Sequence, residues 1–384
     1  MTPPNGPLHG ITVVDLTRVL AGPYCTMMLA DLGARVIKIE NPGRGDDSRQ
    51  VGPFVDGESA YFASVNRNKS SIALDLKDAS DRAVLERMLE GADVLVENFR
   101  AGVMDKLGYT WEMLRARYPR LVYASISGFG QTGPYRNRPA YDMVVQAMGG
   151  LMSVTGEPDG NPARVGVSIG DIGAGLYATI GIQAALLRRA GTGLGERVDI
   201  SMLDCQVALL ENPIARFSAT GNVPKPLGTR HPSITPFDMF ATQDGFVVIA
   251  VGNDALFERL CGALGRPEWA DDPRFASVPA RNEHHADLKQ CLEARLRDAP
   301  TAEWEAILEA AGVPHGPLNG VPQIMDNAHV EARQMLLDVG IGADKSLRVA
   351  GNPIKMGDAW QTGAVRPAPR LDQDREALLG EFGA

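Results

Sequence analysis

One aspartate in this sequence stands among glycines in a way that suits nucleophilic chemistry. Asp171 follows Gly170 and precedes Gly173 and Gly175, at the expected start of an apolar helix over 171–190. Glycines leave space on both sides of the carboxylate for a ligand. Because each glycine costs a helix roughly 1 kcal/mol relative to alanine, they indicate a packing or functional reason. Amides at a helix start can also stabilise an oxyanion. Alternatively, the aspartate only caps the helix, a common role for this residue type.

Two further motifs overlap this segment, and each predicts a different chemistry. Residues 166–170 form a GxSxG motif, which in α/β-hydrolases places a serine, here Ser168, on a tight strand-to-helix turn. No HGGG-type oxyanion segment precedes it, and no clear Asp and His partners follow. Residues 173–178 match GxGxxA, but a dinucleotide-binding fingerprint must open a helix directly after a strand. These glycines fall inside the expected helix, so we expect neither chemistry here.

The composition is that of an ordinary globular protein. The chain has 384 residues, of which 44% are hydrophobic and 22% charged. This length allows two or three domains of about 150 residues each. A formal net charge of −9 disfavours nucleic acids and anionic membranes as partners, because both select basic surfaces.

The cysteines and the amino-terminal residues predict a cytoplasmic protein. The four cysteines lie far apart and form no CxxC pair, which fits neither a disulfide framework nor a zinc site. His284 and His285 lie in a polar stretch and are expected to be solvated, so no metal site is predicted. The first ten residues contain no charged n-region or apolar h-region. No run approaches the roughly 18 apolar residues of a transmembrane helix.

Short β-branched runs alternate with amphipathic segments over the first 200 residues. We expect buried strands at 11–16, 34–40, 71–76, 93–99 and 121–126, with helical patterns between them that include 25–34 and 81–92. Such alternation predicts an α/β fold, with a mostly parallel sheet covered by helices on both faces.

The character of the sequence changes after about residue 215. Residues 225–237 are rich in Pro, Gly and Ser, as in a linker, and a strand-like run at 246–252 and several helices follow. We expect a large domain over 1–215 and a smaller α/β domain over 226–325. A C-terminal segment over 330–384, with a helix, a short strand and a Pro-rich tail, is expected to return to the large domain.

Five segments in a fixed order carry a resemblance to a known family. They are DLTRVLAGPYCTMMLADLGARVIKIENPGRGD (15–46), NRNKSSIALDLK (66–77), ADVLVENFRAGVMDKLG (92–108), SGFGQTGPYRNRPAYDMVVQAMGG (127–150) and SIGDIGAGLYATIGIQAALLRRAGTGLGERVDISMLD (168–204). Together they resemble the family III CoA-transferases of the CaiB/BaiF type, which include formyl-CoA:oxalate and carnitine CoA-transferases. The likeness covers nearly the whole chain. It implies a Rossmann-like large domain, a smaller domain, and ring-shaped subunits interlocked in a homodimer.

The resemblance also implies the site residues. Asp171 matches the nucleophile, and CoA or acyl-CoA is a substrate rather than a tightly bound cofactor. The matching CoA contacts are Leu20, Ala21, Asn41, Leu74, Asp75, Leu76, Lys77, Asn98, Phe99, Arg100, Lys106, Pro139, Ala140, Tyr141 and Asp142. CoA carries a 3′-phosphate and a pyrophosphate, whose charge Lys77, Arg100 and Lys106 can balance. For each of these cations taken alone, a solvated surface position is the favoured interpretation.

The implied activity moves CoA between an acyl-CoA donor and a short, possibly dicarboxylic, acid acceptor through a covalent aspartyl intermediate. A carboxyl with an ordinary pKa near about 3.9 is ionised at pH 7 and attacks a thioester without a general base. We expect one or two hydrogen-bond donors on the Asp171 carboxylate, and further helix-start donors aimed at the thioester oxygen. Because every intermediate hydrolyses readily, the site is expected to exclude water.

Two departures from the family pattern bear on the acceptor. Leu20 stands where formyl-CoA:oxalate transferases have glutamine, and a single Gly228 stands where they have a run of glycines. We therefore do not expect oxalate as the acceptor. Arg230 and His231 could bind an acceptor carboxylate, although a linker histidine without a role is an equal alternative.

Other functions of the same fold remain open at this point. Racemases of α-methylacyl-CoA use a histidine where this chain has Tyr141, and a tyrosine is a far poorer base near pH 7. A protein that only binds CoA would retain CoA affinity but never become acylated.

Overall fold

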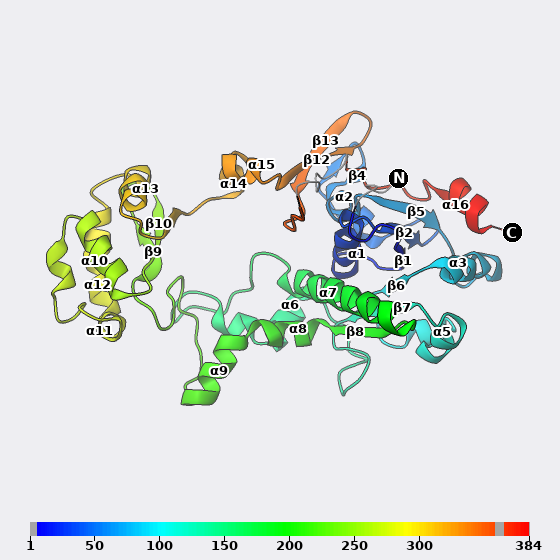
Figure 1. Ribbon diagram of the computed structural model, residues 1–384, viewed down its shortest axis with the longest axis horizontal. Helices are drawn as coiled ribbons and strands as arrows, with labels where there is room; N and C mark the ends of the chain where they lie inside the picture. Colours follow the sequence, from blue (N-terminus) through cyan, green and yellow to red (C-terminus); the bar gives the residue numbers. More distant parts are fainter. Residues whose placement is uncertain (1–5, 358–364, 384) are drawn as a thin grey trace. The chain divides into compact units, whose positions relative to one another are not determined.

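The computed structural model describes residues 6–357 and 365–383. The chain divides into two compact units (Figure 1). The larger unit comprises 1–152, 164–222 and 328–384, and the smaller unit comprises 153–163 and 223–327.

A six-stranded parallel sheet runs through the larger unit. Its strands are β1 (Thr12–Asp15), β2 (Arg35–Glu40), β5 (Lys69–Ala73), β6 (Val94–Glu97), β7 (Val122–Ser127) and β8 (Arg197–Ser201). They pair in the order β5-β2-β1-β6-β7-β8. Numbered along the chain, this order is 3-2-1-4-5-6, that of a doubly wound nucleotide-binding sheet. The mixed α/β fold expected from the sequence is therefore confirmed.

The five expected strands are confirmed with small shifts in their bounds. β5 begins at Lys69 and ends at Ala73, so Leu74 to Leu76, expected within the strand, lie beyond its carboxyl end. The sixth strand, β8, was not expected. It lies at the edge of the sheet and only its last residue, Ser201, is fully buried, so it has no apolar run by which to recognise it.

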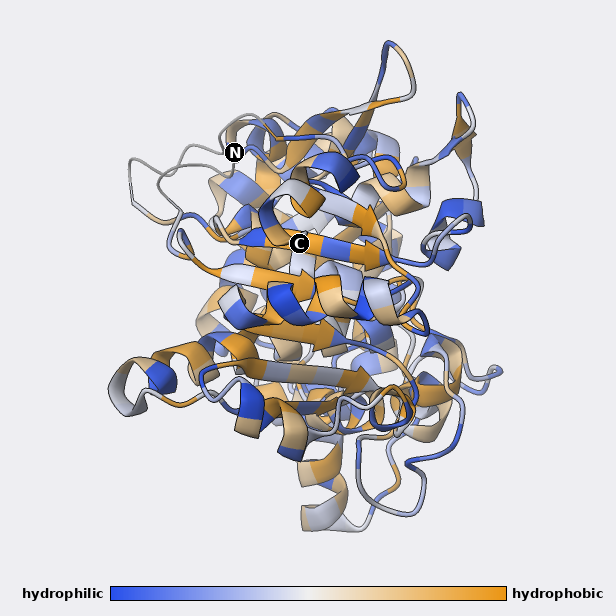
Figure 2. Ribbon diagram, turned by 90° about the vertical axis from the view of Figure 1, so that its right-hand side faces the viewer, coloured by the Kyte–Doolittle hydropathy of each residue, from blue (hydrophilic) through white to orange (hydrophobic). Residues whose placement is uncertain are grey.

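Helices cover both faces of the sheet, because alternate residues of each strand point to opposite sides. Val13 of β1 packs with α1 (Ala21–Asp31) and α7 (Ile169–Thr192), which lie side by side. Its neighbour Val14 packs on the other side, with residues of α3 (Ala79–Gly91), α5 (Trp111–Arg117) and α16 (Arg375–Phe382). Figure 2 shows the strands of the sheet coloured mainly as hydrophobic, as expected for a sheet buried on both faces.

Shorter elements complete the larger unit. The helices are α2 (Ala60–Asn66), α4 (Val103–Lys106), α6 (Asp142–Met148), α8 (Met202–Leu209), α9 (Glu211–Thr220) and α15 (Ala328–Ala332). Two hairpins pair β3 (Phe54–Val55) with β4 (Glu58–Ser59), and β12 (Leu336–Ile341) with β13 (Lys345–Ala350). The C-terminal segment thus contains two strands where one was expected, and α16 follows them.

The smaller unit has its own antiparallel sheet and core. The sheet has the order β11-β10-β9, with β9 at Phe237–Ala241, β10 at Phe246–Ala250 and β11 at His315–Pro317. Its helices are α10 (Asp254–Ala263), α11 (Val278–Glu283), α12 (His285–Leu296), α13 (Thr301–Ala310) and α14 (Val321–Met325). Residues of β9, β10, α10, α12 and α13 share one apolar core.

One expectation about apolar segments needs correction. Within the described residues, α7 is long and apolar enough to cross a membrane by length and composition alone. In this structure the apolar side of α7 packs against the sheet, where Ala174, Ala178 and Ile182 are fully buried in the core. Arg189 near its end is also buried and pairs with Asp93 at 2.7 Å. These contacts are those of a core helix.

The crossing of α1 and α7 depends on Gly175. A Cβ atom at this position would lie 2.8 Å from the carbonyl oxygen of Ala21 and 3.1 Å from Cδ1 of Tyr24. Backbone atoms of α1 cannot yield without moving the whole helix, so a side chain here would push the two helices apart.

We expect Gly175→Ala to lower the free energy of unfolding by about 1–3 kcal/mol, as overpacking of a close contact does. Gly191→Ala, in the same helix, is the matched control. A Cβ atom there meets nothing within 4 Å, so alanine should stabilise by about 0.5–1 kcal/mol. Calorimetry of both variants would measure the difference, and equal stability of the two would contradict this account of the crossing.

Candidate active site

The candidate site lies at the carboxyl ends of β1 and β6. The chain leaves these two neighbouring strands toward opposite sides of the sheet, and in doubly wound folds the crevice at such a point binds the ligand. The segment from Arg18 to Ala21 follows β1, and the segment from Asn98 to Ala101 follows β6. Both segments line a cavity of about 250 Å³, which we call the Asp171 cavity because Asp171 also lines it.

Asp171 is the third residue of α7 and does not cap the helix. Ser168 holds the N-cap position, and its side chain makes no capping hydrogen bond. The capping role belongs instead to Asp142 at the start of α6, whose Oδ1 accepts a hydrogen bond from the N–H of Gly170 at 2.8 Å. Its Oδ2 accepts another from Nε2 of Gln146 at 2.8 Å. The interpretation of Asp171 as a cap is therefore wrong.

The glycines around Asp171 serve close packing within the protein. A Cβ atom at Gly170 would lie 2.9 Å from Oδ1 of Asp142 and 2.8 Å from Cγ2 of Val145. Gly175 makes room for α1 in the same way, as described above. The glycines do have a packing reason, as the sequence indicated. Gly170 and Gly175 make room for neighbouring helices rather than for a ligand.

The carboxyl of Asp171 has an unusual electrostatic environment. Among the described residues, no donor forms a hydrogen bond with its side chain, whereas we expected one or two. Burial, and then the negative charge of Asp142, raise the pKa of Asp171 to about 7. The expectation of an ordinary pKa was wrong, because the sequence shows neither that Asp171 is buried nor that Asp142 lies beside it. Once ionised, a carboxylate with so few hydrogen bonds is a better nucleophile than a solvated one.

A second cavity of about 240 Å³ opens beyond the end of β5; we call it the Leu74 cavity. Its lining is mainly apolar and includes Leu74, Leu76, Phe99 and Leu107, with Lys77 also on its wall. Arg18 and Phe99 line both cavities. The guanidinium of Arg18 lies 5.2 Å from the ring centroid of Phe99 and 3.5 Å from Asp47, so one cation stands between the two cavities.

The structure distributes the expected CoA contacts over these two cavities. The Asp171 cavity contains Leu20, Ala21, Asn98, Phe99, Arg100, Ala140 and Tyr141, and the Leu74 cavity contains Asn41, Leu74, Asp75, Leu76, Lys77 and again Phe99. Lys106, Pro139 and Asp142 line neither. Lys106 and Pro139 are exposed elsewhere, and Asp142 is engaged by Gly170 and Gln146.

Several residues that line the Asp171 cavity were missed from the sequence, and so was Tyr61, which interacts electrostatically with Asp171 but is not among the lining residues. Arg18 and Arg138 line the cavity. Burial and nearby carboxylates, Asp171 first among them, raise the pKa of Tyr61 to about 12, so its phenol stays neutral. Arg18 follows directly after the first strand, where a doubly wound fold binds phosphates, and that position was an available signal. Nothing in the sequence marks Arg138 or Tyr61.

The competing motifs find no support in the local structure. The described residues 161–168 contain no strand, so Ser168 lacks the strand-to-helix turn of an α/β-hydrolase. Residues 173–178 lie inside α7, as expected. In the smaller unit, His231 stacks on Phe237 at 5.2 Å and its Nδ1 accepts a hydrogen bond from the N–H of Ser233 at 3.1 Å. Acceptor binding by Arg230 and His231 stays a prediction. Metal ligands do not gather in groups of three or more among the described residues.

Comparison with known proteins decides the family. The model of CoA-transferase family III matches residues 8–375. The chain belongs to the family III CoA-transferases. Acetyl-CoA:oxalate CoA-transferase of Acetobacter aceti is 48% identical over 383 residues, covering 99% of this chain and 97% of that protein. Succinate–glutarate CoA-transferase of Agrobacterium fabrum is 41% identical, covering 98% and 96% respectively.

A solved structure agrees with these relatives. A CaiB/BaiF family protein from Brucella suis superposes with a TM-score of 0.87 at 40% identity, covering 98% of this chain and all of that chain. The family resemblance seen in the sequence is thus confirmed. This family III enzyme is a CoA-transferase, and CoA thioesters are its substrates.

The link between Asp142 and Asp171 predicts a pH effect. If Asp171 must be ionised to react, kcat/KM should rise with pH through about 7 and then level off. Asp142→Asn removes the negative charge but keeps an oxygen for the N–H of Gly170. The rise of kcat/KM, the acid limb of the pH profile, should therefore move to lower pH. Kinetics from pH 5 to 9 would measure the shift. The exposed Asp344 provides the control Asp344→Asn, and an identical limb in both variants would contradict the prediction.

Proposed function

We propose that this CoA-transferase carries CoA between two acids through covalent intermediates on Asp171. The observation that carries the proposal is a carboxyl without hydrogen-bond donors among the described residues, its pKa raised to about 7, that lines a cavity at the switch point of a doubly wound sheet. The carboxylate attacks the thioester carbon, a mixed anhydride forms, and CoA thiolate leaves. The thiolate then attacks the aspartyl carbonyl, which gives an aspartyl-CoA thioester and frees the donor acid.

The second half of the reaction reverses these steps with a new acid. The acceptor carboxylate attacks the aspartyl thioester and forms a second anhydride, with CoA thiolate as the leaving group. The thiolate attacks the acceptor's carbonyl, which yields the new acyl-CoA and regenerates the Asp171 carboxylate. No general base is needed, because each nucleophile is already an anion.

The two cavities suggest how CoA is held. The apolar Leu74 cavity suits a purine ring, and Lys77 on its wall suits a phosphate. Arg18 lies between the cavities and suits the pyrophosphate, where it can form charge-assisted hydrogen bonds. The pantetheine arm would then extend through the Asp171 cavity to the nucleophile. The CoA contacts inferred from the resemblance follow this path, apart from the three residues that line neither cavity.

We propose a short dicarboxylic acid as the acceptor. Arg100 and Arg138 line the Asp171 cavity, and an arginine can bind a carboxylate through two parallel hydrogen bonds. The relatives named above act on oxalate and on glutarate by their names. The 48% identity to an oxalate enzyme weighs against our expectation from Leu20 and Gly228, so oxalate belongs among the acids to be tested.

We propose that the enzyme is an interlocked homodimer of ring-shaped subunits in the cytoplasm, with the two compact units acting as its domains. Large apolar side chains are exposed along α6, α7, α8 and α9, namely Met143, Val144, Met148, Leu176, Tyr177, Ile180, Leu187, Val207, Leu209, Ile214 and Phe217. Apolar exposure of this kind typically marks an interface. The four cysteines are unpaired, which favours a reducing compartment.

Asp171→Ala should reduce transfer by on the order of 10³-fold or more, the scale of losing a covalent nucleophile. CoA affinity should change little, because the groups proposed to hold CoA lie elsewhere. Mass spectrometry of CoA exchange over a panel of mono- and dicarboxylic acids, together with calorimetric titration of CoA, would test both statements. Ser168→Ala is the control and should stay active.

Trapping identifies the covalent residue directly. With acyl-CoA and no acceptor, hydroxylamine should leave a hydroxamate on Asp171, and borohydride should convert the activated side chain to homoserine. An acyl group on Ser168 would instead support the hydrolase interpretation, and deuterium exchange at the substrate's α-carbon would support a racemase. Transfer that proceeds with Asp171 unmodified would refute the mechanism.

The interlocked dimer predicts an unusual hydrodynamic result. Linked rings cannot separate without unfolding, so sedimentation should give a dimer at every concentration down to the detection limit. The dimer should also persist in urea until the transition at which secondary structure is lost. A monomer at low concentration would contradict interlocking, and a concentration-dependent equilibrium would indicate an ordinary dimer.

A further inference from the structure

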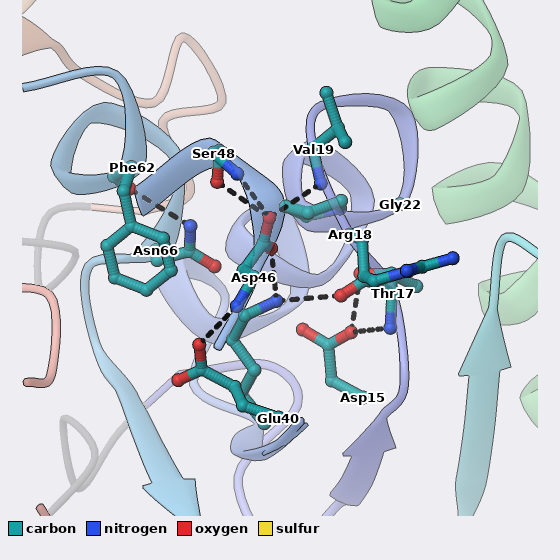
Figure 3. Close-up of polar contacts among 12 residues, drawn as sticks. Asp15, Thr17, Arg18, Val19, Gly22, Glu40, Asp46, Ser48, Phe62 and Asn66 are labelled. Atoms are coloured by element: carbon teal, nitrogen blue, oxygen red, sulfur yellow. Dashed lines mark hydrogen bonds and ion pairs between the residues drawn. The ribbon is translucent and has the colours of Figure 1, made fainter. Parts of the chain in front are cut away.

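Side chains bind five main-chain polar atoms of the turn between β1 and α1, from Thr17 to Val19, and Figure 3 shows several of these contacts. Oδ1 of Asp15 accepts a hydrogen bond from the N–H of Thr17 at 2.8 Å, and Nζ of Lys38 donates to the Thr17 carbonyl at 2.7 Å. Asn98 accepts from the N–H of Arg18 at 2.8 Å and donates to its carbonyl at 2.7 Å. The amide of Asn98, inferred to contact CoA, is therefore engaged with this turn.

Asp46 binds Val19, near the end of the turn. Its Oδ1 accepts a hydrogen bond from the N–H of Val19 at 3.0 Å. Val19 has φ of +67°, a left-handed conformation that is strained for a β-branched residue. Such strain persists only where the surroundings impose it. Asp46 is therefore one of the groups that keep Val19 in this conformation.

Asp46 acts from inside the protein. Its side chain and that of Lys38 are both fully buried, and Oδ2 lies 2.8 Å from Nζ of Lys38. The N–H and hydroxyl of Ser48 also donate to Oδ1, at 2.9 and 2.8 Å. The pKa of Asp46 lies well below its usual value because of Lys38 and these donors, which prevail over the effect of burial. Asp46 is one of the residues that line the Leu74 cavity, but it does not line the Asp171 cavity and its side chain has no exposed surface. An effect of Asp46 on kcat must therefore pass through the turn rather than through contact with the reacting groups.

The turn forms one wall of the Asp171 cavity. Arg18, Val19, Leu20 and Ala21 all line it. The wall and the nucleophile are also mechanically linked, because α1 begins at Ala21 and packs against α7 at Gly175 without space to spare. Acyl transfer needs the reacting atoms within about 3–3.5 Å, and a displacement of about 1 Å can cost roughly 100-fold in rate.

We propose that Asp46 is a positioning residue for acyl transfer: through its bond to Val19 it holds the wall from Arg18 to Ala21 at the correct distance from Asp171. This inference rests on the proposed role of Asp171 as the nucleophile. The alternative is that Asp46 only stabilises the fold as half of a buried ion pair.

Three single variants separate the two roles. Asp46→Ala removes the acceptor for Val19 and should lower kcat by about 10- to 100-fold, measured per folded molecule. Asp46→Asn keeps that acceptor but loses the ion pair, so it should lose stability and retain kcat within a few-fold. The control Asp31→Ala breaks another buried ion pair, the one between Asp31 and Arg67. Asp31 lines neither of the two cavities. This control should lose stability with kcat unchanged.

A double variant tests the pathway through Val19. Glycine adopts φ of +67° without strain, so Val19→Gly should restore kcat to Asp46→Ala at least severalfold. Should Asp46→Ala not fold, Lys38→Met with Asp46→Leu replaces the pair without leaving a buried charge. That variant should be stable and still transfer slowly.

Trapping of Asp171 with hydroxylamine in the unmodified enzyme accompanies these measurements. A missing hydroxamate overturns the role of Asp171, and this inference with it. A hydroxamate on Asp171, together with equal kcat values for Asp46→Ala and Asp31→Ala, overturns the positioning role alone. If Asp46→Ala does not fold, an unchanged kcat in the Lys38→Met/Asp46→Leu variant has the same meaning.

Discussion

Near the carboxyl ends of β1 and β2, ionised side chains are buried in opposite-charge pairs, one of which includes the first residue of β5. Asp15 pairs with Lys69 at 3.1 Å, and Lys38 pairs with Asp46 at 2.8 Å, with all four side chains fully buried. A buried pair contributes little net stability, but losing one partner costs about 3–5 kcal/mol. The main effect of the two ion pairs is therefore that the four buried side chains, and the main chain they bind, can adopt only one arrangement. Since Asp15, Lys38 and Asp46 all bind the turn after β1, that arrangement fixes one side of the active site.

Asp171 is the opposite case, a carboxyl that the protein leaves without hydrogen-bond donors in the described part of the chain. Because its pKa is raised to about 7 from an ordinary 3.8, the folded protein binds this proton more tightly than the unfolded chain does. The contribution of Asp171 to the free energy of unfolding therefore becomes less favourable as the pH rises from about 4 to 7. The fold carries this free-energy cost at the residue proposed to react, whereas Asp46 lies among donors and a cation that favour its charge.

Local patterns predicted the sheet, and long-range contacts limited the prediction of the site. Apolar runs marked five strands because those strands are buried on both faces. β8 escaped because an edge strand with exposed residues carries no such run. Asp171 was predicted to be the nucleophile from its neighbours and the family resemblance, and this role stays a prediction. Its raised pKa was not predicted, because the burial of its carboxyl and the approach of Asp142 both arise only when α6 packs against the start of α7. The sequence also could not show that the turn depends on Asp46, because the hydrogen bond joins Val19, after β1, to Asp46, after β2.

The two cavities share only Arg18 and Phe99 among their lining residues. The part of the protein proposed to hold the nucleotide and the part proposed to meet the acids are therefore nearly independent in composition. Substitutions around Asp171 can accumulate during evolution without weakening the grip on the part of CoA that every substrate has in common. Such a modular division provides a physical route for one ancestral scaffold to diversify into enzymes for different acids.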